Sequence, residues 1–130
     1  MWDDEIREYK LYVSHIDNDD NEYNIFLDKL NARHDFEWIN YSIPGNKNYI
    51  EQMKDVDIVI ILSGHYSKDE FAIKNQLEYA KKLKKPIIAV RPYGMENVPT
   101  FIEDLVQDIV GWNSSCIVEV IKENALNDQL

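Results

Sequence analysis

Apolar runs of strand length alternate along the chain with stretches of helical spacing. The clearest run covers residues 58–62, which are unbroken and mostly β-branched. Such a run is typical of a central parallel strand that is covered on both faces. A short polar stretch follows at residues 63–67, and then a helical segment that ends at Pro86. Ser67 and Glu70 have the spacing of a capping box, which predicts that this helix begins near Ser67.

The same reasoning divides the rest of the chain into further elements. Short β-rich runs predict strands, and apolar residues at helical spacing predict helices. The pair Pro44-Gly45 is a strong stop signal after the second expected strand. The expected strands cover residues 10–15, 36–43, 58–62, 87–90 and 108–112, and the expected helices contain residues 23–30, 46–56, 67–85, 98–105 and 117–125.

Strands that alternate with helices predict a parallel sheet with helices on both faces. Right-handed crossovers make a flavodoxin-like α/β fold of three layers, with strand order 2-1-3-4-5, the leading topology. In that order the switch point lies between the first and third strands. The loop after Ser14-His15 would then lie beside the loop after Ser63, and the two polar loops would form one cleft for a ligand.

Composition narrows the class of protein. A length of 130 residues with 45% apolar residues suits one soluble domain, residues 1–130. The net charge of −10 disfavours nucleic acid as a partner. No apolar run reaches the ~18 residues of a membrane helix, the acidic start does not resemble a signal peptide, and the single Cys116 suits a reducing compartment. We therefore expect a cytoplasmic protein with neither a membrane nor a nucleic acid as partner.

Three known uses of such a cleft can be compared with the residues present. A flavin or phosphate site is disfavoured because the loop after the first strand carries Asp17, Asp19 and Asp20 and no glycine. A phospho-receiver would use those acids to bind Mg²⁺, but Ser63 stands where it needs an Asp. A nucleophilic hydrolase is disfavoured because the chain has no Gly-x-Ser-x-Gly turn to present a nucleophilic serine. A receiver-like regulator stays open as an alternative. The spacing of the His and Asp residues does not resemble a known metal site, so no resident metal is predicted.

Six collinear stretches carry a family resemblance, and together they span roughly residues 10 to 122. The chain resembles the bacterial TIR-like domains (Toll/interleukin-1 receptor homology), and most closely the short type found in Thoeris anti-phage defence. The stretches are residues 11–15, 40–44, 59–67, 76–80, 85–92 and 108–113.

The resemblance implies a function as well as a fold. Many members cleave the nicotinamide–ribose bond of NAD, as glycohydrolases or ADP-ribosyl cyclases, and some make an ADP-ribose-derived signal that diffuses to a downstream effector. NAD is then a substrate, and no cofactor is expected. Self-association or a phage-derived activator would switch the protein on. Loss of nicotinamide develops positive charge on the ribose, which a buried carboxylate can stabilise.

The sequence departs from the family at the position of that carboxylate. The family has a Glu in the helix after the third strand, and the matching residue is Gln76. The family's usual Trp is replaced by Ala72, with Phe71 beside it. A neutral amide can bind hydroxyls but cannot stabilise a cation by charge. Two interpretations follow: the chain is a Glu→Gln form of an enzyme, or it is a non-catalytic adaptor that assembles through the loop at Pro44-Gly45.

The candidate site residues lie in the loops after the first three strands and in this helix. The catalytic candidates are Gln76, at the position of the family Glu, and His65. The resemblance places Ser42 in the loop that TIR domains use for self-association and for gating the site. The candidates for substrate binding are Ser14, His15, Asp17, Asp20, Ser42, Ser63 and Ser67.

Overall fold

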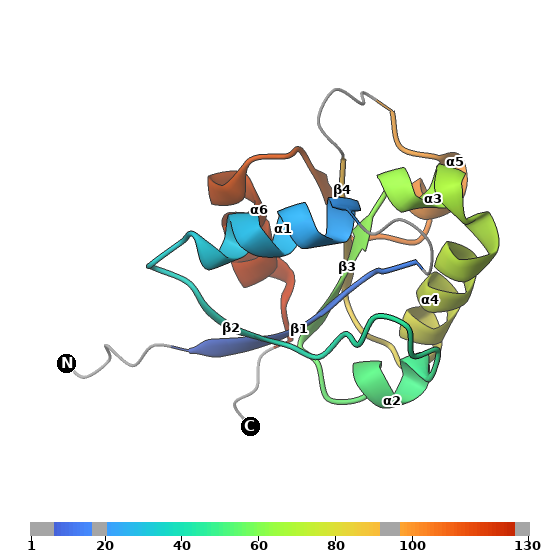
Figure 1. Cartoon of the computed structure of the whole chain (residues 1–130), viewed down its shortest axis with the longest axis horizontal. Coiled ribbons are helices and arrows are strands. Elements are labelled where there is room, and N and C mark those ends of the chain that lie inside the picture. Colours follow the sequence, from blue (N-terminus) through green and yellow to red (C-terminus); the bar gives the residue numbers. More distant parts are fainter. Residues whose placement is uncertain (1–6, 17–20, 92–96, 127–130) are drawn as a thin grey trace.

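Five strands form one parallel sheet in the computed structural model, which describes residues 7–16, 21–91 and 97–126 (Figure 1). The strand order is β2-β1-β3-β4-β5, and every neighbouring pair is parallel. The predicted order 2-1-3-4-5 is confirmed. The strands are β1 (Glu8–Val13), β2 (Glu37–Asn40), β3 (Ile58–Leu62), β4 (Ile87–Val90) and β5 (Asp108–Val110).

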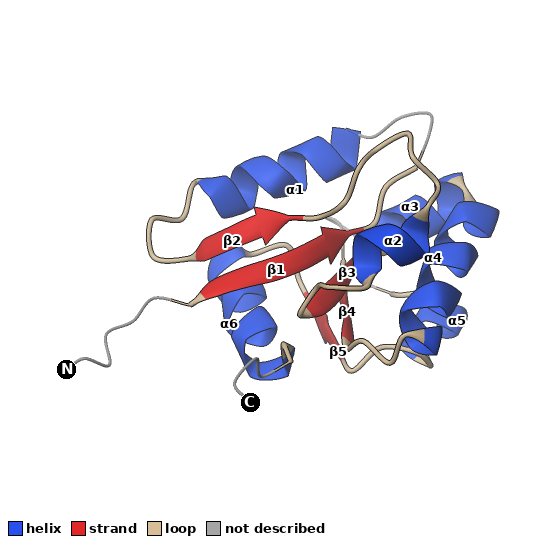
Figure 2. Cartoon of the chain, turned by 90° about the horizontal axis from the view of Figure 1, so that it is seen from below, coloured by secondary structure: helices blue, strands red, loops and turns tan. Residues whose placement is uncertain are grey.

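Helices cover both faces of the sheet, which gives the predicted three layers. Helices α1 and α6 lie on one face, and α2, α3, α4 and α5 lie on the other (Figure 2). The helices are α1 (Asn21–Asn31), α2 (Tyr49–Met53), α3 (Gly64–Lys68), α4 (Glu70–Lys82), α5 (Thr100–Glu103) and α6 (Ser114–Asn124).

Alternate residues of the central strands build two cores. Ile58, Ile60 and Leu62 of β3 face α1 and α6, whereas Val59 and Ile61 face α2, α4 and α5. All five have 0% exposure, as expected for a strand covered on both faces. Complete burial of a side chain of this size stabilises the fold by about 1.5–3 kcal/mol. The buried central strands therefore fix the positions of the residues that follow their carboxyl ends.

The predicted capping box at Ser67 and Glu70 is wrong. Residues 64–68 form the separate short helix α3, and the N-cap of α4 is Asp69. The Asp69 carboxylate accepts a hydrogen bond from the Ala72 N–H at 3.1 Å. Ser67 instead donates to the carbonyl of Gly64 at 3.3 Å. The start of α4 is therefore marked by an acidic side chain, which also lines a pocket.

The second strand and the helix after it are shorter than predicted. Beyond Asn40 the chain turns, because the Asn40 side chain accepts a hydrogen bond from the Ser42 N–H at 2.9 Å. Helix α2 starts after Asn48, which caps it by accepting from the Glu51 N–H. Ile50, which was expected to face inward, is 40% exposed. The segment between β2 and α2 is therefore an irregular loop.

Candidate functional site

A cluster of buried polar side chains lies where β1 and β3 end. Ser14, Ser63, His65 and Gln76 have 0% exposure, and His15 has 2%. The fold thus brings the loops after β1 and β3 together, as the switch-point rule anticipates. All five side chains lie beneath the surface, so their first role in this structure is to hold elements together.

Gln76 uses both ends of its amide on the end of β1. Its Oε1 accepts hydrogen bonds from the Tyr12 hydroxyl at 2.5 Å and from the His15 N–H at 3.2 Å. Its Nε2 donates to the His15 carbonyl at 2.8 Å and to the Ala72 carbonyl at 3.2 Å. The side chain therefore binds the N–H and the carbonyl of one backbone residue at once.

This pairing needs an amide. A backbone N–H only donates and a carbonyl only accepts, so the partner must carry one acceptor and one donor in fixed positions. An ionised carboxylate accepts only, and would set negative oxygen atoms against the carbonyls of His15 and Ala72. Gln76 is thus a positioning residue for His15 in this structure. Its predicted catalytic role stays a prediction.

The cluster continues from His15 to the loop after β2. His15 Nε2 lies 3.3 Å from the Tyr12 hydroxyl and 3.4 Å from Gln52 Oε1. Gln52 Oε1 also accepts from the Ile43 N–H at 2.8 Å, and its Nε2 donates to the Asn46 carbonyl at 2.9 Å. Gln52 is 4% exposed. One buried hydrogen-bond network thus joins α4, the end of β1 and the loop at residues 43–46.

The remaining predicted residues have local partners. Ser14 Oγ accepts from the Leu62 N–H at 2.9 Å and lies 3.2 Å from His65 Nδ1. Ser63 donates to the Val90 carbonyl at 3.3 Å. These bonds hold the ends of β1, β3 and β4 to one another and to α3.

Ser42 is 6% exposed, and its hydroxyl lies 2.8 Å from that of Tyr23 in α1. Ser67 is on the exposed side of α3. Asp17 and Asp20 lie outside the described residues. The structure thus brings Ser14 and His65 into contact, bonds Ser63 to β4, and gives Ser42 and Ser67 partners of their own.

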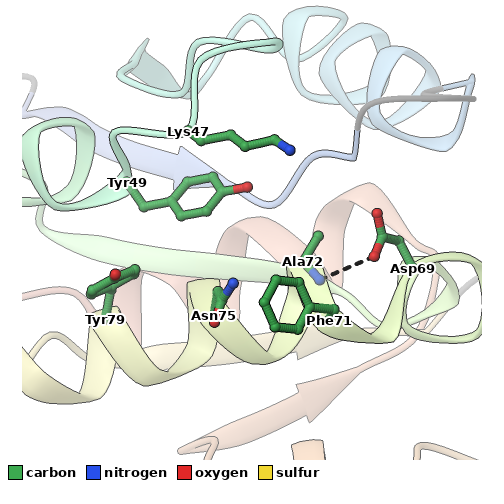
Figure 3. A pocket seen from close by; sticks show the side chains of 7 residues that line it. All are labelled: Lys47, Tyr49, Asp69, Phe71, Ala72, Asn75 and Tyr79. Carbon is green, nitrogen blue, oxygen red and sulfur yellow. Dashed lines mark hydrogen bonds between the residues drawn. The ribbon is translucent and has the colours of Figure 1, made fainter.

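An open pocket lies beside this cluster, between the loop before α2 and the start of α4 (Figure 3). Its volume is about 160 Å³. A second pocket of about 300 Å³ adjoins it along α4 and shares Asn75 and Tyr79 with it. The first pocket is lined by Lys47, Tyr49, Asp69, Phe71, Ala72, Asn75 and Tyr79, and the second also by Glu78 and Lys82.

The first pocket combines aromatic rings with both signs of charge. Phe71 is 75% exposed, which is unusual for a ring of its size. The rings of Tyr49 and Tyr79 lie 6.2 Å apart, and Tyr49 also lies 5.9 Å from the His15 ring. Tyr49 thus links the pocket to the buried network. Sequence analysis did not select these residues as a site, although Phe71 stood out beside the family's Trp position.

A small charged group flanks the pocket on the outer side of α4. The Glu70 carboxylate lies 3.1 Å from the Lys74 ammonium and accepts from the Tyr66 hydroxyl at 3.0 Å. The hydrogen bond from Lys74, with a smaller one from Tyr66, lowers the pKa of Glu70. Burial, and next the bond to Glu70, raises the pKa of Tyr66. Glu70 is therefore held by neighbours outside the pocket, whereas Asp69 faces into it.

Within residues 7–16, 21–91 and 97–126, no group of three or more His, Cys, Asp or Glu side chains is placed to hold a metal ion. In that same part of the chain, no helix has the length and apolar content needed to cross a membrane.

The sheet order and the polar ends of β1 and β3 define an α/β protein of the flavodoxin-like class. A solved structure of this class, the signal receiver domain of a putative Luxo repressor protein from Vibrio parahaemolyticus, superposes with a TM-score of 0.59. It shares 6% sequence identity, and the match covers 91% of this chain and 90% of that one. At this identity the similarity establishes the fold alone.

Sequence comparison identifies the family within that class. The family described as "Thoeris protein ThsB, TIR-like domain" matches residues 12–97, which is more than half of the chain. The chain belongs to this family, and the resemblance inferred from its sequence is confirmed. A comparison with curated protein sequences gave no match.

Proposed function

We propose that this TIR-domain protein acts in anti-phage defence by recognising an NAD-type dinucleotide in the pocket between residues 46–49 and α4. The observation that carries the proposal is the composition of that pocket, with aromatic rings, an ammonium and a carboxylate placed against the network that holds residue 76. The two adjoining pockets together fall within the ~300–1,000 Å³ of typical small-molecule sites. An extended ligand with two ring systems suits this shape.

Each part of such a ligand has a complementary side chain. The exposed ring of Phe71 offers a flat face on which a ligand ring can stack. The Lys47 ammonium suits the negative pyrophosphate. Tyr79 and the second pocket extend the surface toward Lys82, with room for the other half of the dinucleotide. The proposal also includes two partners that the resemblance implies. A phage-derived activator would switch the protein on, and a downstream effector would respond to it.

Removal of the Phe71 ring tests the proposal. We expect Phe71→Ala to weaken NAD⁺ binding about tenfold, because stacking of a base on an aromatic ring is worth about 1–3 kcal/mol. Its stability should barely change, since the ring is 75% exposed. Isothermal titration calorimetry measures the affinity. Ile25→Ala removes another exposed apolar side chain, 45% exposed on α1, and should bind as the wild type does. Absence of NAD⁺ binding to the wild type would refute the proposal.

Cleavage of the nicotinamide–ribose bond is the second candidate function, and membership of the family favours it. In that reaction water adds to C1′ of the ribose and nicotinamide leaves with the bonding electron pair. The transition state carries positive charge, which a neutral amide at residue 76 does not offset. Binding of NAD without cleavage of its nicotinamide–ribose bond is therefore more compatible with a buried amide at residue 76.

We expect the purified chain to bind NAD⁺ without releasing nicotinamide above the rate in buffer. Chromatography of the reaction mixture measures free nicotinamide and any ADP-ribose product. The same assay with lysate of phage-infected cells tests whether an activator is needed. Release that tracks the protein concentration in either case would establish the enzyme and reject recognition alone.

A further inference from the structure

We infer that Asp69 makes this pocket selective for the oxidised, cationic form of the nicotinamide ring. This inference rests on the proposed function, because it specifies which ring of the dinucleotide lies at which end of the pocket. It assigns a specificity-determining role to a residue that sequence analysis did not select.

The position of Asp69 carries the inference. Asp69 lines the pocket together with Lys47 and Phe71, and its carboxylate is fixed by the bond from the Ala72 N–H (Figure 3). Among the described residues that line this first pocket, it is the only carboxylate. Its side chain is half-buried, whereas Gln76 has 0% exposure. The negative charge available to a ligand in this pocket therefore stands at residue 69 and not at residue 76.

The spacing along α4 places Asp69 and Gln76 on one side of the helix. Residues 69 and 76 are seven apart, which places them on the same face of a helix and about 10 Å apart along its axis. Ala72 lies between them and contacts both side chains, through its N–H and its carbonyl respectively. Asp69 lines the pocket, whereas Gln76 is buried against His15 at the end of β1.

The chemistry of the ligand supplies the selectivity. The oxidised nicotinamide ring carries a positive charge and the reduced ring is neutral, while the rest of the two dinucleotides is identical. A carboxylate in a partly desolvated pocket attracts the cation, and aromatic faces such as that of Phe71 add to that attraction. We therefore place the nicotinamide ring at the Asp69–Phe71 end and the adenine half toward Tyr79.

Affinities for three ligands test this assignment. NAD⁺, NADH and ADP-ribose are titrated into the wild type and into Asp69→Asn by calorimetry. Asn caps a helix about as well as Asp does, so the variant loses the charge and keeps the cap. We expect the wild type to prefer NAD⁺ over NADH about tenfold, the size expected for one partly screened charge interaction. The variant should bind both with nearly equal affinity, with ADP-ribose binding unchanged.

A matched control removes the neighbouring charge. Glu70→Gln neutralises the adjacent carboxylate, which is held by Lys74 and Tyr66 outside the pocket, and should keep the preference for NAD⁺. If Asp69→Asn fails to fold, Asp69→Ser offers a second capping residue without charge. Equal wild-type affinity for NAD⁺ and NADH, or a preference that survives in the Asp69 variants, overturns the inference. Binding of none of the three ligands refutes the proposed function itself.

Discussion

Replacement of Gln76 by Glu should lower the free energy of unfolding by about 3 kcal/mol at pH 7, because it leaves an uncompensated charge in the interior. The new carboxylate would face the carbonyls of His15 and Ala72, which now accept from the amide at 2.8 and 3.2 Å. Only the two bonds to its acceptor oxygen, from Tyr12 and the His15 N–H, could be kept. Urea denaturation of both proteins measures the difference.

The loss of stability should depend on pH in a definite direction. Burial and the facing carbonyls raise the folded-state pKa of the introduced carboxyl above its unfolded value of about 4.3. A protonated carboxyl can donate, so the deficit is smallest below that unfolded value and grows as pH rises through the folded pKa. Denaturation at pH 5 and pH 7 should therefore show a smaller difference from the wild type at pH 5.

A control and a functional readout make this test decisive. Asn24→Asp makes the same amide-to-acid change at an exposed position of α1 and should shift stability by less than about 0.5 kcal/mol. The Gln76→Glu variant should not gain nicotinamide release, because its carboxylate lies beneath the end of β1. A variant that is as stable as the wild type at pH 7 and releases nicotinamide would show that Gln76 replaces a catalytic Glu.

Much of the fold could be predicted because the strands and helices have recognisable patterns of apolar residues. The unbroken run of β3 and the stripe of Ile73, Leu77 and Ala80 on α4, all with 0% exposure, identified a buried strand and its helix. The order of strands followed from right-handed crossovers together with the strand order of flavodoxin-like sheets. Element ends were less predictable. Ser67 and Asp69 both have cap chemistry, and only the extra turn of α3 decides between them.

The site could be predicted only in part, for a physical reason. Rules of fold topology placed Ser14 beside Ser63 without any knowledge of side chains. The partners of Gln76 are set by tertiary contacts, since it bonds to a residue 61 positions away in the chain. Burial of the cluster follows from how α4 packs on β1, and no local pattern reports that. Lys47 and Phe71 likewise become neighbours of one pocket only after folding.

Gln52 gives the second test, because its side chain links His15 to residues 43–46, the loop that directly precedes the pocket's lysine. Gln52→Leu keeps the volume but leaves the Ile43 N–H and the Asn46 carbonyl without their side-chain partner. Each buried group left unsatisfied is worth about 1–3 kcal/mol. We expect the Ile43 amide to exchange its hydrogen about tenfold faster or more, because local opening of the loop becomes easier. Hydrogen exchange followed by NMR measures this rate.

Measurement of NAD⁺ binding shows whether Gln52→Leu acts through the loop or through a general loss of stability. Lys47 and Tyr49 directly follow this loop, so its release should disorder one wall of the pocket and weaken NAD⁺ binding about tenfold or more. Gln107→Leu removes a comparable bond, from the Ile87 N–H at 2.7 Å, at the start of β4. That variant should leave Ile43 exchange and NAD⁺ affinity unchanged. Unchanged Ile43 exchange in Gln52→Leu would mean that the loop is held by other contacts, and that the buried network does not set the shape of the pocket.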